Sequence, residues 1–157
     1  MFTLVGRLTT PVVQDFESPV FPPVNWAVDN ADGSITWERT TAAAKTGNAS
    51  MVIRTFDYPL AKTIDKFVSP VITTNPNYDS LFVTFDLAYA LGSNGTNGNI
   101  DTLELQVSRD CGQTFTTVWK KFGTELVTSS TFGRFTPAAK DWNNIKTYLT
   151  PFVNTPG

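Results

Sequence analysis

The sequence contains no histidine and only one cysteine, Cys111. Without histidine the chain lacks the usual general base for a serine or cysteine nucleophile, and a zinc site built from cysteine and histidine is excluded. A single cysteine forms no disulfide within the chain. Positive charge is not in surplus either, because 12 basic residues stand against 14 acidic ones. We therefore expect no nucleic-acid partner, which would require a basic face.

Long apolar runs are also missing. The first residues, "MFTLVGRLTTPVV", are interrupted by Arg7 and Pro11, and they lack a basic segment followed by a long apolar core. This pattern predicts neither a signal peptide nor a membrane span. A length of 157 residues fits one domain with a sizeable core. We expect residues 1–11 to be an N-terminal extension or linker and residues 12–157 to form that domain.

Short segments that alternate between apolar and polar residues are abundant. Residues 80–90, "SLFVTFDLAYA", alternate throughout, and "DTLELQVS" repeats the pattern shortly before "TFTTVWKK"; such alternation predicts half-buried strands. Further strand candidates are "VNWAV", "SITWER", "SMVIRTF", "KFVSPVI" and "WNNIKTYL". Only "TAAAK" has helix propensity, and it is too short to hold a helix unaided. The sequence predicts an all-β fold, a two-sheet antiparallel β-sandwich of the jelly-roll, concanavalin A-like kind.

The segment "SRDCGQTF", Ser108 to Phe115, has the form of the Asp-box hairpin known from sialidases. Ser108 and Asp110 can satisfy the amides of a turn, and Gly112 admits a positive φ. A sialidase would need several such hairpins in propeller blades and an arginine cluster, whereas this chain has one such hairpin and scattered arginines. We interpret the motif as a folding device. Because the chain also lacks a clustered acid pair, we expect it not to be an enzyme.

Several segments occur in an order that resembles a known family. They are "QDFESPVFPPVNW", "ITWERT", "KTGNASMVIRTFDY", "DKFVSPVI", "DSLFVTFDLAYA" and "DTLELQVSRDCGQTFTTVWKK". Together, over about Val12 to Phe152, they resemble the MAM-like, cleaved-adhesin type of jelly roll found in secreted and surface proteins of Bacteroidetes, gingipain-type proteases included. The resemblance implies a noncatalytic adhesion module that binds a glycan or a host or surface protein. The alternative is a structural accessory domain that packs on a neighbouring secreted protease or glycosidase.

The resemblance also implies a location and a context. We expect a secreted or cell-surface bacterial protein in which this chain is an internal piece of a larger precursor, with neighbouring domains as partners. Members of the family continue beyond the point of "LTPFV" into a closing strand and a terminal strand that ends in paired aspartates, whereas this sequence ends at Gly157. We therefore expect the domain to be incomplete at its C-terminus, with strand complementation by another chain as one consequence.

Two carboxylates near the start form the first candidate metal site. Asp15 and Glu17 lie two residues apart, which on an expected strand places both on one side of the chain. Hard oxygen ligands of this kind suit Ca²⁺, which takes about 6 to 8 of them. The resemblance implies that a structural calcium lies where Glu17 meets the turn at Gly47 and Asn48. The alternative is that the two carboxylates form a solvated strand face.

The loop "DNADGS" is the second candidate metal site. Asp29 and Asp32 lie in a turn that resembles an acidic calcium loop. The alternative for this loop is an ordinary turn.

Three aromatic residues, Trp37, Tyr89 and Trp119, are the candidate ligand-binding residues. Sugar-binding jelly rolls stack a pyranose on such flat faces, which requires two or more exposed and coplanar rings with polar groups around them. The alternative is core packing, because Trp37 and Trp119 lie inside alternating segments where an aromatic side chain normally faces the other sheet.

Overall fold

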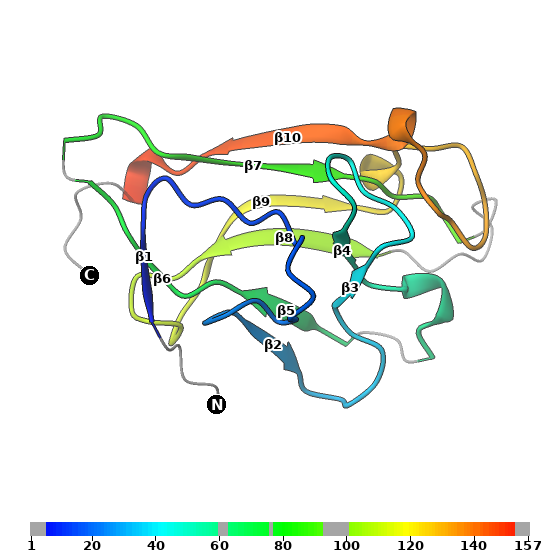
Figure 1. Cartoon of the computed structure of the whole chain (residues 1–157), viewed down its shortest axis with the longest axis horizontal. Coiled ribbons are helices and arrows are strands. Elements are labelled where there is room, and N and C mark those ends of the chain that lie inside the picture. Colours follow the sequence, from blue (N-terminus) through cyan, green and yellow to red (C-terminus); the bar gives the residue numbers. More distant parts are fainter. Residues whose placement is uncertain (1–5, 60–62, 76, 93–100, 153–157) are drawn as a thin grey trace. The chain divides into compact units, whose positions relative to one another are not determined.

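The computed structural model describes residues 6–59, 63–75, 77–92 and 101–152. Over these residues the regular elements are β-strands and one-turn 3-10 helices, with no α-helix among them (Figure 1). Most of the strands pair antiparallel, so the prediction of an all-β fold is confirmed. The chain divides into two compact units, residues 1–73 and residues 74–157.

The first unit consists of strands that pair two by two. Its elements in chain order are β1 (Arg7–Thr9), β2 (Ala27–Asn30), β3 (Glu38–Thr40), β4 (Ser50–Val52), the 3-10 turn η1 (Thr55–Asp57), β5 (Asp65–Val68) and β6 (Val71–Thr73). β2 pairs antiparallel with β5, and β3 with β4. β1 runs parallel to β6, whereas antiparallel pairing was expected. Through this pairing Arg7–Thr9, part of the expected N-terminal extension, belong to a strand ladder.

Phe67 of β5 lies at the centre of an aromatic cluster in the first unit. The ring of Trp26 stacks on it with centroids 4.7 Å apart, Phe21 stacks at 5.7 Å, and Phe16 lies tilted at 5.9 Å. These separations are those at which aromatic rings attract one another beyond the effect of burial alone. The residues that precede β2 are thereby held against β5.

The second unit contains the longer strands. Its elements are β7 (Phe82–Leu87), β8 (Thr102–Val107), β9 (Thr116–Phe122), η2 (Gly123–Leu126), η3 (Ala139–Asp141), β10 (Asn143–Tyr148) and η4 (Thr150–Phe152). β7 pairs antiparallel with β10, and β8 pairs antiparallel with β9 as a hairpin. In Figure 1 these four strands run lengthwise along the ribbon of this unit.

One face of β7 packs inward and the other is open. Val83 and Phe85 are half-buried, whereas Phe82 and Thr84 are exposed, as the alternation of the sequence predicts. The Phe85 ring meets the ring of Trp119 on β9 edge to face, with centroids 5.5 Å apart. This contact joins the β7–β10 ladder to the β8–β9 hairpin.

Candidate functional site

The Glu17 carboxylate holds the turn at residues 47–49. Its Oε1 accepts hydrogen bonds from the backbone N–H of Asn48, at 2.8 Å, and of Ala49, at 3.0 Å. Its Oε2 accepts one from Nδ2 of Asn48 at 3.2 Å. These bonds, those from Asn48 first, lower the pKa of Glu17 because amide donors favour the charged carboxylate. The structure thus brings Glu17 and this turn together through amide donors, which a cation at the same oxygens would have to displace.

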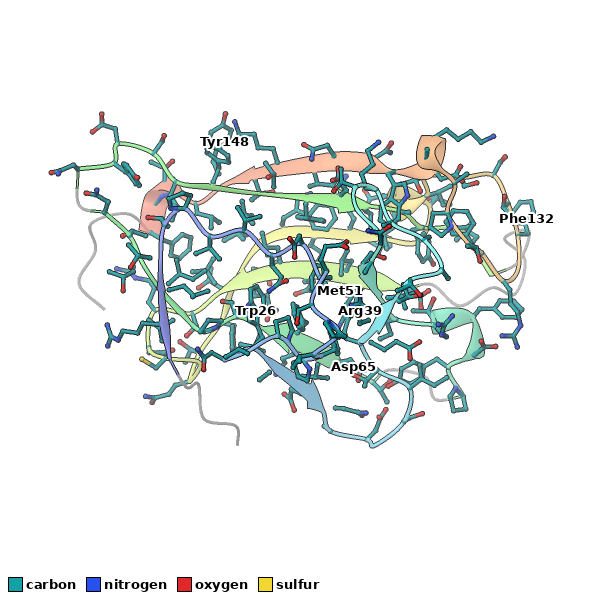
Figure 2. The ribbon with its side chains drawn as sticks, viewed as in Figure 1. Trp26, Arg39, Met51, Asp65, Phe132 and Tyr148 are labelled. Atoms are coloured by element: carbon teal, nitrogen blue, oxygen red, sulfur yellow. The ribbon has the colours of Figure 1, made fainter. Side chains whose placement is uncertain are left out.

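Gly47 and Arg39 complete this arrangement. Gly47 has a φ of +67°, and a Cβ at this position would overlap the Glu17 carboxylate. The guanidinium of Arg39, labelled in Figure 2, donates to the carbonyl oxygens of Phe16, at 2.6 Å, and of Glu17, at 3.2 Å. Glu17 is therefore fixed through both its backbone and its side chain.

Asp15 does not join this group. Its Oδ1 accepts a hydrogen bond from the backbone N–H of Glu17 at 3.1 Å, which is a local turn contact. The expected strand around these residues is absent, because residues 12–22 form no strand and Phe16 has a φ of +60°. A left-handed residue interrupts the alternation that would place the two carboxylates side by side.

The second candidate pair is split between two environments. Asp29 lies in β2 opposite Lys66 of β5, and its Oδ2 is 3.4 Å from the Lys66 ammonium. Asp32 lies in the loop, where its Oδ1 accepts the backbone N–H of Ser34 at 2.9 Å. Its Oδ2 accepts the hydroxyl of Tyr58 at 2.8 Å. Only Asp32 of this pair therefore faces the Tyr58 hydroxyl.

The Tyr58 hydroxyl also meets a carboxylate that the sequence interpretation did not single out, Asp65, at 2.7 Å from Oδ2. The side chain of Thr63 lowers the pKa of Tyr58, but burial and the hydrogen bonds to Asp65 and Asp32 outweigh it and raise that pKa to about 12. The pKa of Asp32 is lowered, chiefly by the Ser34 N–H and then by the Tyr58 hydroxyl. Two carboxylates thus share one hydroxyl.

The Asp-box residues satisfy their own turn. Ser108 Oγ accepts the N–H of Gly112 at 2.7 Å, and Asp110 Oδ1 accepts the N–H groups of Gln113, at 3.1 Å, and Thr114, at 2.8 Å. The hydroxyl and backbone N–H of Thr114 are the main causes that lower the pKa of Asp110 to about 2. Gly112 has a φ of +88°. These contacts agree with the interpretation of the motif as a folding device.

The three aromatic candidates are half-buried, and each makes an internal contact. Trp37 donates its Nε1–H to the carbonyl oxygen of Asp65 at 3.3 Å. Tyr89 donates its hydroxyl to Asp101 at 2.9 Å, and burial raises the pKa of Tyr89. Trp119 packs against β7, as described above. None of the three is among the large apolar residues that are most exposed in the described part of the chain.

A different aromatic surface lies on the open face of β7 and β10. Phe82 and Tyr148 are opposite each other in the ladder, 50% and 62% exposed, with ring centroids 6.3 Å apart and planes at 64°. The Lys146 ammonium lies 4.0 Å from the Phe82 centroid, and Asn144 donates to Asp86 at 3.1 Å. Figure 2 shows Tyr148 projecting from β10. We call these five residues the β7–β10 strip. The sequence signal for it was Phe82, an aromatic residue on the otherwise polar face of its strand.

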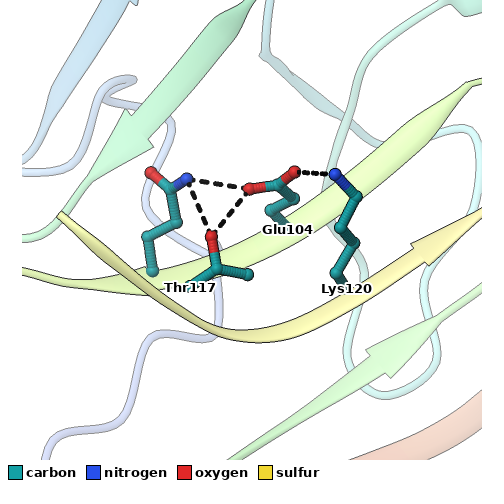
Figure 3. A network of polar contacts seen from close by, with 4 residues as sticks. Glu104, Thr117 and Lys120 are labelled. Carbon is teal, nitrogen blue, oxygen red and sulfur yellow. Dashed lines mark hydrogen bonds and ion pairs between the residues drawn. The ribbon is translucent and has the colours of Figure 1, made fainter.

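A polar network crosses the β8–β9 hairpin (Figure 3). Glu104 accepts hydrogen bonds from Gln106, at 2.8 Å, and Thr117, at 3.0 Å, and pairs with the Lys120 ammonium at 2.7 Å. Lys120 is the first cause of the lowered pKa of Glu104. With its carboxylate and ammonium paired, this network joins the two strands of the hairpin.

The described residues contain no group of three or more aspartate, glutamate, cysteine or histidine side chains placed to hold a metal. They also contain no helix with the length and hydropathy to cross a bilayer. Comparison with protein-family models, curated proteins and solved structures finds no match. The MAM-like resemblance therefore remains an interpretation of the sequence.

Proposed function

We propose that the chain is a noncatalytic glycan-binding module of a secreted or surface-anchored bacterial protein, built as a MAM-like jelly-roll sandwich. The β7–β10 strip is the observation that carries this proposal. The antiparallel ladders of both units and the order of the sequence segments support the jelly-roll architecture. The resemblance supports the bacterial surface location.

The β7–β10 strip combines the two kinds of group that a sugar needs. The C–H face of a pyranose is apolar and packs on an aromatic ring, for which Tyr148 is the more exposed of the two rings. The hydroxyl groups need charged or amide partners, which Lys146, Asn144 and Asp86 supply on the same face. Because the two rings are inclined at 64°, one ring rather than a flat pair serves for stacking.

A second candidate function is a structural accessory domain that packs on a neighbouring protease or glycosidase. Phe122 and Phe132, 52% and 56% exposed, favour it, because neither belongs to the β7–β10 strip. Where exposed large apolar side chains form one contiguous patch, that patch is commonly a protein interface.

Glycan-array screening of the labelled chain, followed by titration of the best oligosaccharide, tests the proposal. We expect Tyr148→Ala to weaken binding at least tenfold and Phe82→Ala to weaken it as well. Tyr78→Ala is the matched control, since Tyr78 is 40% exposed but lies outside the strands, and it should bind as the wild type does. Oligosaccharide binding that survives Tyr148→Ala would contradict the assignment of the strip. The accessory role would be favoured if the chain binds no glycan on the array but binds a neighbouring catalytic domain through Phe122.

A further inference from the structure

Two buried oxygen atoms at the end of the β2–β5 ladder have no hydrogen-bond partner among the described residues. They are Oδ1 of Asn30 and Oδ1 of Asp65. Asn30 and Asp65 are opposite each other in the antiparallel register, so their side chains leave the same face of the ladder about 4.5 to 5.5 Å apart at Cβ. A buried oxygen without a donor is costly, which makes a pair of them at one place a strong indication of a missing positive partner.

The orientation of the Asn30 amide follows from its other contact. Its Nδ2 donates to the carbonyl oxygen of Ser34 at 2.8 Å, so the oxygen of this amide is the atom left without a donor. The N–H of Ser34 in turn donates to Asp32 at 2.9 Å. The Asn30 and Asp32 side chains are therefore tied to the same residue of the loop.

The Tyr58 hydroxyl contacts both carboxylates of this group. It lies 2.8 Å from Oδ2 of Asp32 and 2.7 Å from Oδ2 of Asp65. A neutral phenol has one proton and donates it to one acceptor at a time, so one of these two carboxylate oxygens faces a phenol oxygen without a proton between them. The ion pairs found among the described residues include neither Asp32 nor Asp65. Asp65 thus shares its hydroxyl donor with Asp32, whose carboxylate also accepts the Ser34 N–H and a hydrogen bond from the Thr63 side chain.

We propose that Asn30, Asp32 and Asp65 bind Ca²⁺, with the Tyr58 hydroxyl as an additional oxygen. The donor set consists of two carboxylates, an amide oxygen and a phenol oxygen, which are the hard ligands that Ca²⁺ selects. Two carboxylates balance the charge of a divalent ion. Asp29, which precedes Asn30, leaves the opposite face of β2 and pairs with Lys66, so it does not take part. The inference is independent of glycan binding.

The affinity should be that of an extracellular calcium module, with a Kd on the order of 10⁻⁴ to 10⁻³ M, because only two of the ligands are charged. Isothermal titration of the full chain with CaCl₂, with melting in CaCl₂ and in EGTA, measures it. We expect Asp65→Asn and Asp32→Asn to raise the Kd at least tenfold. Asp29→Asn, from the same segment but the opposite face, should leave it unchanged within about twofold.

Terbium provides a readout that does not depend on stability, since Tb³⁺ replaces Ca²⁺ and its emission is sensitised by nearby aromatic rings. The Trp37 indole bonds the backbone of Asp65 at 3.3 Å, so Trp37→Phe should reduce the sensitised emission without abolishing calcium binding. Failure of the wild-type chain to bind millimolar CaCl₂, or an equal response to MgCl₂, would overturn the proposal. Loss of binding in Asp29→Asn or Glu17→Gln instead of Asp65→Asn would also overturn it, because the site would then lie elsewhere.

Discussion

Replacement of Gly47 by alanine tests whether Glu17 holds the 47–49 turn as the structure places it. Gly47 has a φ of +67°, and an added Cβ would meet the Glu17 carboxylate, with Cδ only 3.0 Å away. Gly33 has nearly the same φ, +68°, but nothing lies within 4 Å of the corresponding Cβ. The two glycines therefore separate the cost of backbone conformation from the cost of the collision.

The change in the free energy of unfolding expected for Gly33→Ala depends on the backbone conformation alone. A left-handed conformation costs a residue with a Cβ roughly 1 to 2 kcal/mol, and the loss of glycine's freedom in the unfolded chain returns about 0.4 to 1 kcal/mol. We expect Gly33→Ala to lower the free energy of unfolding by about 1 kcal/mol. Gly47→Ala carries the same backbone cost and in addition displaces the carboxylate from Asn48 and Ala49, so it should cost clearly more.

Urea unfolding of both variants, alone and combined with Glu17→Ala, measures the difference. In the Glu17→Ala background the collision is gone, and Gly47→Ala should then cost only the ~1 kcal/mol of its backbone conformation. The coupling between positions 17 and 47 should exceed the ~0.5 kcal/mol within which independent sites add. Equal costs for Gly47→Ala and Gly33→Ala in the wild-type background would refute the reasoning.

Three further predictions concern the second unit. Because the pKa of Asp110, about 2, is below its unfolded value near 4, its stabilisation is present above pH ~4 and is lost as the pH falls toward 2. The difference in unfolding free energy between wild type and Asp110→Asn should therefore shrink between pH 5 and pH 2.5, and a constant difference would contradict the assignment. Gly112→Val, at a φ of +88°, should destabilise the chain by at least ~1 to 2 kcal/mol in urea unfolding, whereas a neutral result would show that the turn adapts. Phe85→Ala should cost about 2 to 3 kcal/mol, below the ~3 to 5 of a fully buried phenylalanine, and Thr84→Ala on the exposed face should cost under ~0.5; equal effects in the same assay would place both side chains on the surface.

The strands could be predicted because their alternation is a local property of the sequence. β7 and the β8–β9 hairpin lie where the pattern placed them, and in the first part of β7 exposed and half-buried side chains alternate as expected. "KFVSPVI" was expected as one strand but forms β5 and β6 on either side of Ser69 and Pro70. Proline has no N–H for a ladder, so a strand is interrupted there.

Strand pairing could not be predicted, because it depends on contacts far apart in the sequence. The residues of β1 were expected to belong to an extension. The sequence of these three residues does not indicate that they pair in parallel with Val71–Thr73. The left-handed φ of Phe16 could not be predicted either, because residues other than glycine seldom adopt it. Both examples show the limit of periodicity, which indicates that a segment is extended but not what lies beside it.

The carboxylates of Glu17 and Asp65 differ in how many donors already occupy their oxygens. At Glu17 both carboxylate oxygens accept amide N–H groups, Oε1 from Asn48 and Ala49 and Oε2 from Asn48. At Asp65 one oxygen accepts a shared hydroxyl and the other, though buried, accepts nothing among the described residues. A cation at Glu17 would have to break three hydrogen bonds, whereas at the proposed site it would give a partner to one oxygen each of Asn30 and Asp65 and would compete with existing donors only at Asp32 and Tyr58. Glu17, which the sequence singled out, is thus occupied by its own turn, whereas Asp65, which it passed over, keeps one buried oxygen without a partner among the described residues.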